Sequence, residues 1–253
     1  MGVRRLTADD LFVVFQPIVD MATGRTFAQE ALVRCRHSDY PNPPVLFEHA
    51  AKEGVCGRLG RLIRNIAFNS NEETTLFVNV HPDELTSRWL VQPDDPVGFQ
   101  RRPVHLEITE TTAFTHHELC MSVLKDLCKR TGALLVVDDF GAGYSNLERV
   151  VALEPAIVKL DLLLIRDIHH NKTKQAVVRH MVNLCKELGT RVVAEGVEEL
   201  DELTCVRDCG VHYAQGYLLA RPALPAPMAD WPLGPRKNGP RSRRPSRGPS
   251  RPA

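Results

Sequence analysis

Two adjacent carboxylates at the end of an apolar run are the first residues here whose types and spacing suggest chemistry. The run spans residues 134–137, the carboxylates are Asp138 and Asp139, and a Gly-x-Gly turn begins at Gly141. Such a run is typical of a strand buried on both faces. A turn beginning at Asp139 could bring both carboxylates to one site, and their mutual repulsion favours a divalent cation between them. The alternative interpretation is an Asp-rich turn in which Asp139 caps the next helix.

Polar residues also lie near the ends of the other predicted strands. They are Glu30, Asn79, Glu107, Lys159, Glu195 and Gln215. Oxygen ligands of this kind suit Mg²⁺ or Mn²⁺ rather than zinc. Two such ions favour in-line attack of water on a phosphodiester, and Lys159 could orient or deprotonate that water. Each residue alone could be a surface residue, an ion-pair partner or a cap, but the agreement of the whole set with one geometry argues against that.

Alternating strands and helices would position these residues. Strands are predicted at 12–20, 25–34, 76–80, 104–108, 134–139, 156–160, 191–195 and 213–219. Helices are predicted at 45–53, 58–68, 118–130, 172–188 and 198–209, the fourth with Val177, Met181, Leu184 and Leu188 on one apolar face. The order predicts an α/β fold, a TIM-like (β/α)8 barrel with one antiparallel strand in the opening hairpin. A barrel would bring the carboxyl ends of its parallel strands to one rim.

Composition supports a globular protein with a large core. The 253 residues are 43% hydrophobic and 25% charged, and no apolar run is long enough to cross a membrane. Seven cysteines, an odd number without a C-x-x-C pair, predict reduced thiols. The first ten residues lack the apolar core of a signal peptide. We therefore expect a cytoplasmic protein.

The last residues differ in composition from the rest of the chain. From Arg236 onward there are seven basic residues and no acidic one, among many Pro, Ser and Gly. We predict a short N-terminal segment at 1–11, one domain at 12–228 and a disordered basic tail at 229–253. Binding of the tail to nucleic acid is an alternative, but a solubilising or accidental extension is the interpretation we favour.

Several motifs in order give the chain a family resemblance. They are Glu30-Ala31-Leu32-Val33-Arg34, Phe77-Val78-Asn79-Val80, Leu106-Glu107-Ile108-Thr109-Glu110, Val137-Asp138-Asp139-Phe140-Gly141, Val158-Lys159-Leu160-Asp161, Ala194-Glu195-Gly196-Val197-Glu198 and Gln215-Gly216-Tyr217. Any one of these is weak, but together they are highly specific. From residue 12 to residue 222 the chain resembles the EAL domain, the bacterial cyclic di-GMP phosphodiesterase.

The resemblance implies a role for each candidate residue. Glu30, Asn79, Glu107 and Asp138 would hold one Mg²⁺ or Mn²⁺, and Asp138 would bridge to a second ion held by Asp139 and Glu195. Lys159 would contact the attacking water, and Gln215 would help to position water or metal. Glu110 would anchor the loop at 139–146, which couples metal binding to a homodimer interface. The nucleotide groove would be lined by Gln16, Leu32, Arg34, Asp161 and Pro222.

The implied reaction opens one phosphodiester of cyclic di-GMP and leaves linear pGpG, and a regulatory protein partner would fit a domain without its own sensor.

Two departures from the family pattern keep an alternative open. Cys35 stands where the family usually has Trp, and leucines occupy 162–164. The alternative is a non-catalytic receptor for cyclic di-GMP or a protein-interaction module, but none of the implied metal ligands is missing.

Overall fold

The strands close into a barrel in chain order. The structure is a computed structural model that describes residues 2–86, 90, 92–109, 117–141 and 152–234. Its strands are β1 (Leu11–Asp20), β2 (Thr26–Cys35), β3 (Leu76–Asn79), β4 (Val104–Thr109), β5 (Leu134–Phe140), β6 (Ile157–Leu160), β7 (Arg191–Ala194) and β8 (Tyr213–Ala214). Strand β1 runs antiparallel to both β2 and β8, and every other neighbouring pair is parallel. The predicted barrel with one antiparallel strand is confirmed.

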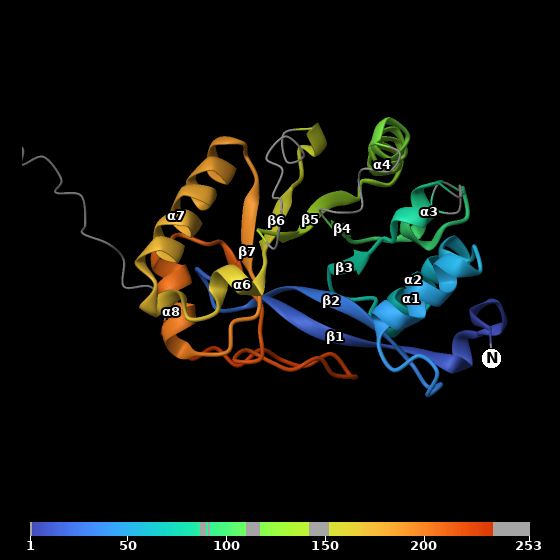
Figure 1. The fold of residues 1–253 in the computed structure, drawn as a ribbon, viewed down its shortest axis with the longest axis horizontal. Coiled ribbons are helices and arrows are strands. Elements are labelled where there is room, and N and C mark those ends of the chain that lie inside the picture. Colours follow the sequence, from blue (N-terminus) through green and yellow to red (C-terminus); the bar gives the residue numbers. More distant parts are fainter. Residues whose placement is uncertain (1, 87–89, 91, 110–116, 142–151, 235–253) are drawn as a thin grey trace, which may run out of the picture.

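Helices surround the strands. They are α1 (Pro43–Lys52), α2 (Cys56–Ser70), α3 (Pro82–Thr86), α4 (His117–Thr131), α6 (Leu162–Ile165), α7 (Lys172–Glu187) and α8 (Leu200–Asp208). Short 3-10 helices are η1 (Val3–Arg5), η2 (Ala8–Asp10), η3 (Pro96–Phe99) and η5 (Ile168–His170). Figure 1 shows α1 to α3 on one side of the strands and α7 and α8 on the opposite side. None of the helices in the described ranges combines the length and hydrophobicity that a membrane span requires.

One layer of side chains inside the barrel is almost entirely apolar. Its buried residues come from seven of the strands and are Ile18, Ala28, Phe77, Val136, Ile157, Val193 and Tyr213. His105 of β4 completes the layer and stacks on the Phe77 ring, with centroids 4.2 Å apart. Burial lowers the pKa of His105 to about 4, so the imidazole is neutral near neutral pH. This layer fills the barrel below the polar residues that share the same interior face.

The segment after β8 lies along β1 and β2 and reaches the hairpin between them. The Phe15 and Ala223 backbones pair as an isolated bridge, and Gln29 Nε2 donates to the Pro227 carbonyl at 3.2 Å. The Trp231 ring lies so close to Gly24 that a Cβ there would come within 2.4 Å of it. Residues 229–234, expected to belong to a disordered tail, therefore pack on the barrel. Residues 235–253 lie outside the described part of the chain.

The predicted last strand is too long. Strand β8 ends at Ala214, and the amides of Leu219 and Ala220 donate back to the Gly216 carbonyl. A Cβ at Gly216 would lie 2.0 Å from the Val197 carbonyl oxygen. The close approach of the loop after β7 thus turns the chain at Gly216 instead of letting the strand continue.

Helix α7 buries a different face from the apolar face noted in the sequence. Its buried residues are Val178, Val182 and Cys185. Val177 and Leu188, which the sequence places on that apolar face, are 40% and 45% exposed. That face is not the buried one because both faces of this helix carry apolar residues at helical spacing, and only packing against β7 decides between them.

Candidate active site

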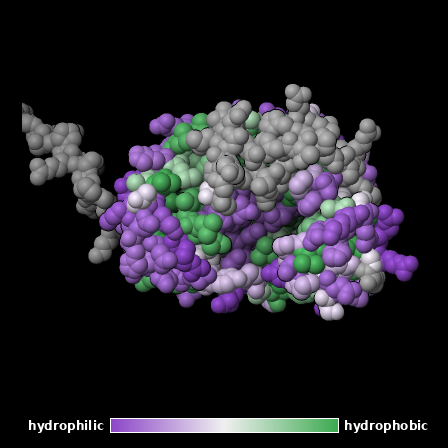
Figure 2. Space-filling model, viewed as in Figure 1, coloured by the Kyte–Doolittle hydropathy of each residue, from purple (hydrophilic) through white to green (hydrophobic). Residues whose placement is uncertain are grey.

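A second interior layer, two residues further toward the rim along each strand, is polar. Its members are Gln16, Glu30, Asn79, Glu107, Asp138, Lys159, Glu195 and Gln215. Side chains two apart in a strand point to the same face, so each of these residues lies above a member of the apolar layer. Figure 2 shows that one face of the molecule is hollowed in its middle and that the hollow is mainly hydrophilic. The barrel therefore brings together seven of the eight residues predicted from the strand ends, and Gln16, predicted only as a groove residue, is the eighth member of the layer.

Lys159 lies at the centre of the polar layer and is fully buried. Its Nζ is 2.7 Å from Glu107 Oε1 and 2.7 Å from Glu195 Oε1. Asp138 Oδ1 is 3.3 Å away and Glu30 Oε1 is 3.7 Å away. Among the described residues, Lys159 Nζ and Glu107 Oε1 have no partner with hydrogen-bond angles, so these contacts are ion pairs rather than well-aligned hydrogen bonds. The charged side chains therefore lie close together, while two of their polar atoms still have hydrogen-bonding capacity that no described atom uses.

The carboxylates of this cluster carry more negative charge than Lys159 balances. Burial opposes the charge on Lys159, but Asp138, Glu107, Glu195 and Glu30 together raise its pKa well above the usual value. Burial, with repulsion from other carboxylates, raises the pKa of Glu107 and Glu195 well above normal in spite of Lys159. In this arrangement Lys159 is an ammonium, which donates hydrogen bonds but does not accept a proton.

Glu30 and Gln215 form a polar pair beside Lys159. Gln215 Nε2 donates to Glu30 Oε2 at 2.5 Å and to Gln16 Oε1 at 3.0 Å. Burial opposes the charge on Glu30, but Lys159, with Gln215, keeps its pKa below the usual value. Asn79 Nδ2 donates to Glu107 Oε2 at 3.1 Å. These amides fix the carboxylates that face the centre of the barrel.

A bulge in β5 turns both aspartates toward the cluster. Pairing between β5 and β6 shifts register between Val137 and Phe140, and Asp139 has a positive φ of 56°. Carboxylate oxygens of Asp138, Asp139 and Glu195 consequently lie within 4.8 Å of one another. The expected turn beginning at Asp139 is thus a bulge inside a strand that continues to Phe140. Burial and the neighbouring Asp138 raise the pKa of Asp139 to about 6.

The donor set fits a hard divalent cation. Five carboxylates share this end of the barrel with one lysine, and the raised pKa values of Glu107, Asp139 and Glu195 reflect uncompensated charge. Glu107 Oε1 and the Gln215 side-chain oxygen are buried without a hydrogen-bond partner among the described atoms. Oxygen atoms of this kind are the ligands that Mg²⁺ and Mn²⁺ prefer. An added positive charge would relieve the repulsion that the ionised site carries.

Of the residues predicted to line a nucleotide groove, Leu32 borders a cavity. It lines a space of about 480 Å³ together with Glu30 and Asn79 of the polar layer. Sequence reasoning missed the apolar wall of this cavity, which includes Pro43 and Phe47. The only signal for it was the Pro-rich loop before α1.

The other expected groove residues make local contacts. Gln16 Nε2 donates to the Ala220 carbonyl at 3.0 Å, and Pro222, two residues further along the chain, is half-buried. Arg34 donates to its neighbour's carbonyl, that of Val33, at 2.8 Å. Asp161 caps α6 by accepting the Leu163 amide at 2.7 Å.

Glu110 and residues 142–146 of the predicted loop lie outside the described residues. The leucines at 162–164 form α6. A Cβ at Gly141 would meet Leu164 Cδ1 at 2.4 Å, and a Cβ at Gly196 would meet Leu162 at 2.6 Å. The leucines therefore pack on the two loops that follow Asp139 and Glu195.

The sequence model of the EAL domain matches residues 3–222. The chain belongs to the EAL domain family. It is 31% identical over 238 residues to the cyclic di-GMP phosphodiesterase PA2567 of Pseudomonas aeruginosa, covering 89% of this chain and 40% of that protein. It is 30% identical over 241 residues to the cyclic di-GMP phosphodiesterase PdeR of Escherichia coli, covering 90% and 36%. The chain thus spans about two fifths of the length of these relatives.

Solved structures of EAL proteins share the fold. The complex of Klebsiella pneumoniae BlrP1 with manganese and cyclic di-GMP matches with a TM-score of 0.73 and 33% identity, over 85% of this chain and 56% of that one. An EAL domain protein of Listeria monocytogenes matches with a TM-score of 0.74 and 27% identity, over 88% and 91%. This EAL domain therefore has the same barrel fold as these relatives.

Proposed function

We propose that this EAL domain hydrolyses one phosphodiester bond of cyclic di-GMP and releases linear pGpG, in a reaction that depends on divalent metal. The observation that carries the proposal is the buried Lys159 ammonium among four carboxylates at one end of an EAL barrel. The names of the two curated relatives and the nucleotide complex of the Klebsiella protein support the choice of substrate.

The proposed metals are two Mg²⁺ or Mn²⁺ ions. Glu30, Asn79, Glu107 and Asp138 would hold the first, with an Asn79 side chain that offers its oxygen once its amide is turned. Asp138 would bridge to the second, which Asp139 and Glu195 would complete. When bound, the ions would supply Lewis-acid activation of water and charge neutralisation at the phosphate.

The chain's own residues would orient the reaction. Water's oxygen would form a bond to phosphorus while the ester P–O bond breaks. One proton of the water would pass to the leaving ribose oxygen, which becomes a hydroxyl, and the other would stay on the new phosphate or pass to solvent. Lys159, as an ammonium, would donate to the water or to a phosphate oxygen and stabilise the developing negative charge. Gln215, held by Gln16 and Glu30, would position the water.

The expected groove residues would hold the nucleotide. Leu32 would offer apolar contact at the wall of the 480 Å³ cavity. Arg34 would exchange its contact with the Val33 carbonyl for a phosphate or guanine, because its guanidinium offers a rigid donor fork. Gln16, Asp161 and Pro222 would complete the groove, and Glu110 would anchor the loop after Asp139.

The test is hydrolysis of cyclic di-GMP by the purified chain with Mg²⁺, with Mn²⁺ and with chelator, with the products separated by chromatography. We expect pGpG to form only with metal. Glu195→Ala and Asp138→Asn should each abolish turnover while circular dichroism stays unchanged. Glu187→Ala, at the exposed end of α7, is the matched control and should turn over normally.

Near-normal rates in either active-site variant would refute the two-metal assignment. Nucleotide binding without any product, in wild type with metal, would instead identify a receptor. Neither binding nor product would identify an interaction module. These outcomes separate the proposed enzyme from the alternatives that the departures at Cys35 and 162–164 raise.

We extend the proposal to a homodimer that forms through the loop at 139–146, and to control by a regulatory protein partner. Sedimentation of the purified chain tests the dimer. We also propose action in the cytoplasm, which the free thiols of six of the seven cysteines, Cys35, Cys56, Cys128, Cys185, Cys205 and Cys209, support.

A further inference from the structure

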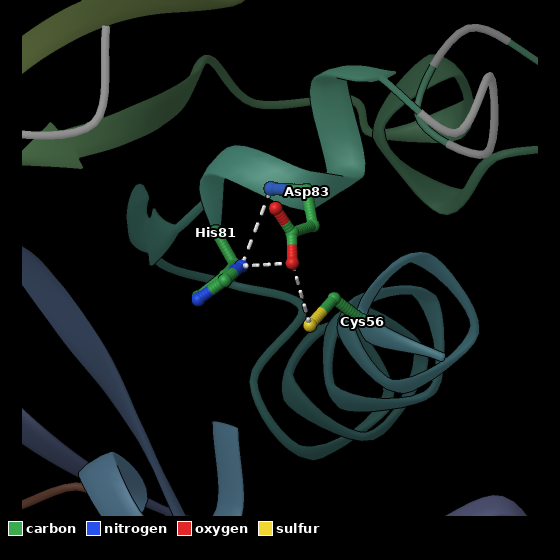
Figure 3. A group of neighbouring side chains, drawn as sticks. All are labelled: Cys56, His81 and Asp83. Carbon is green, nitrogen blue, oxygen red and sulfur yellow. Dashed lines mark hydrogen bonds and ion pairs between the residues drawn. The ribbon is translucent and has the colours of Figure 1, made fainter. Parts of the chain in front are cut away.

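A cluster outside the carboxylate site brings together a thiol, an imidazole and a carboxylate. Cys56 begins α2, His81 precedes α3 and Asp83 lies in its first turn. One ligand atom from each lies within 4.8 Å of the other two. Figure 3 shows the three side chains converging from the two helices, with the second ring nitrogen of His81 pointing away. No residue of this cluster belongs to the polar layer of the barrel.

From this geometry we propose that Cys56, His81 and Asp83 form a site for Zn²⁺, with a water as the fourth ligand. Cysteine sulfur and histidine nitrogen are ligands that Zn²⁺ takes and Mg²⁺ does not favour. The site would therefore select a different ion from the all-oxygen cluster around Lys159.

The distances between the ligand atoms are close to those of a tetrahedral zinc site. Cys56 Sγ is 3.8 Å from Asp83 Oδ2, and His81 Nδ1 is 3.9 Å from the same oxygen. Zinc bond lengths place tetrahedral S–O and N–O pairs about 3.6 Å and about 3.4 Å apart. Both pairs need to close by no more than about half an ångström, which side-chain rotation supplies.

The protonation of His81 suits a ligand. The Asp83 amide donates to His81 Nδ1 at 3.3 Å, which puts the lone pair on Nδ1 and the proton on Nε2. The Phe47 ring stacks on the imidazole at 5.2 Å between centroids and sets its plane. Nδ1 lies 3.9 Å from Asp83 Oδ2, and an ion bound there would take the place of the Asp83 amide at the Nδ1 lone pair.

The backbone that carries His81 and Asp83 is anchored to α2 by a buried ionic network. Glu84 accepts the His81 amide at 3.0 Å, and Arg64 of α2 donates to Glu84 at 2.6 Å. Arg64 also pairs with the buried Asp95 at 2.8 Å. These contacts hold α3 against the helix that begins with Cys56, so the three ligands are placed together before any ion binds.

The three side chains differ in burial, and this leaves one coordination position of a bound ion open to solvent. Cys56 is 2% exposed, whereas the side chains of His81 and Asp83 are 26% and 53% exposed. An ion would thus be reached from the side of Asp83, and solvent would supply the fourth ligand. Burial and the carboxylates of Asp83 and Glu84 raise the pKa of Cys56 to about 12, so without a metal this sulfur is a thiol and not a nucleophile.

An occupied site would stiffen the connection between β3 and α3. His81 follows Asn79 by two residues, and both line the same 480 Å³ cavity. The ion would therefore tie α2 to the chain segment that carries one of the residues of the polar layer. The site itself does not depend on the proposed hydrolysis.

The experiment uses the full chain, freed of metal by chelator and then saturated with Mg²⁺ to fill the carboxylate cluster. Co²⁺ is titrated as a spectroscopic substitute for Zn²⁺. We expect a thiolate-to-cobalt charge-transfer band that saturates at one equivalent and disappears when Zn²⁺ is added. Cys56→Ser should lose the band, and Cys128→Ser, a half-buried cysteine on α4, should keep it.

Asp83→Asn keeps the test valid if Cys56→Ser does not fold, because Asp83 is at the surface. Loss of even an indirect partner of a metal ligand lowers affinity about 10- to 100-fold, so Asp83→Asn should weaken cobalt binding by more than about tenfold and keep the band. Absence of the band in wild type, its persistence in folded Cys56→Ser, its loss in Cys128→Ser, or unchanged affinity in Asp83→Asn would each overturn the proposal.

Discussion

Replacing Asp139 by Asn should stabilise the metal-free protein while removing a presumed metal ligand. The Asp139 carboxylate is half-buried next to Asp138, and its pKa is raised to about 6 from an ordinary value of 3.8. The unfolded chain therefore loses this proton more easily than the folded chain does. Ionisation at neutral pH opposes folding, and an amide of the same shape removes that opposition.

The magnitude follows from the shift. A change of about 2 pKa units corresponds to about 3 kcal/mol of unfolding free energy, at 1.36 kcal/mol for each unit. The stability that the protonated Asp139 contributes is fully present below the unfolded pKa and is lost as the pH rises through the folded pKa. The advantage of Asp139→Asn should thus grow from about 1 kcal/mol near about pH 4.5 to about 3 kcal/mol near about pH 8.

The assay is urea denaturation with chelator at several pH values between these limits, followed by circular dichroism. Asp208→Asn, at an exposed aspartate whose side chain is 73% accessible, is the matched control and should change nothing. Asn also tolerates the positive φ at this position, which adds a stabilisation that does not vary with pH. Only the part that varies with pH therefore reports on the charge.

A difference between Asp139→Asn and wild type that is constant with pH would refute the reasoning. So would a destabilised variant at high pH in chelator. Either result would mean that the Asp139 carboxylate is not forced to carry an uncompensated charge in the metal-free fold.

Further predictions concern the same end of the barrel and its supports. Arg64→Met should destabilise the fold by about 3–5 kcal/mol in urea, because Glu84 and Asp95 keep their buried charges and lose the guanidinium; a loss below about 1 kcal/mol would contradict this. Gly216→Ala should destabilise by about 1–3 kcal/mol, because the added Cβ meets the backbone of the loop after β7 at 2.0 Å; unchanged urea denaturation would show that the loop moves freely. Mn²⁺ at about 100 times its dissociation constant should stabilise wild type by about 2.7 kcal/mol, and Asp138→Asn should gain much less in the same thermal denaturation.

The sequence predicted most of the polar layer because a barrel leaves few possible positions for the residues at the ends of its strands. Residues at the carboxyl ends of parallel strands must meet at one rim, and the alternation of side chains then selects the interior positions. Glu107 and Lys159, which are far apart in the chain, could be placed together on this ground alone. The distances between them, and the central position of Lys159, required packing that no local pattern contains.

Other features depend on contacts between distant elements. The bulge that turns Asp139 toward Asp138 arises from the shifted register between β5 and β6, whereas the sequence only indicated a turn. The buried face of α7 could not be chosen from periodicity because both faces are apolar. The approach of Cys56 to Asp83 depends on how α2 packs on α3, and 26 residues separate them with no spacing that predicts the contact.

The direction of β1 decides how a neighbouring module would meet the barrel. Because β1 is antiparallel, its first residue Leu11 pairs with Cys35 at the rim end of β2, whereas Trp231 packs at the hairpin of Gly24 at the opposite end. A domain fused ahead of the barrel would enter beside the polar layer and could touch bound substrate. A domain fused directly after residue 234 would leave the barrel at the end opposite the polar layer. Modules joined ahead of Leu11 and directly after residue 234 should therefore differ in their influence on the site.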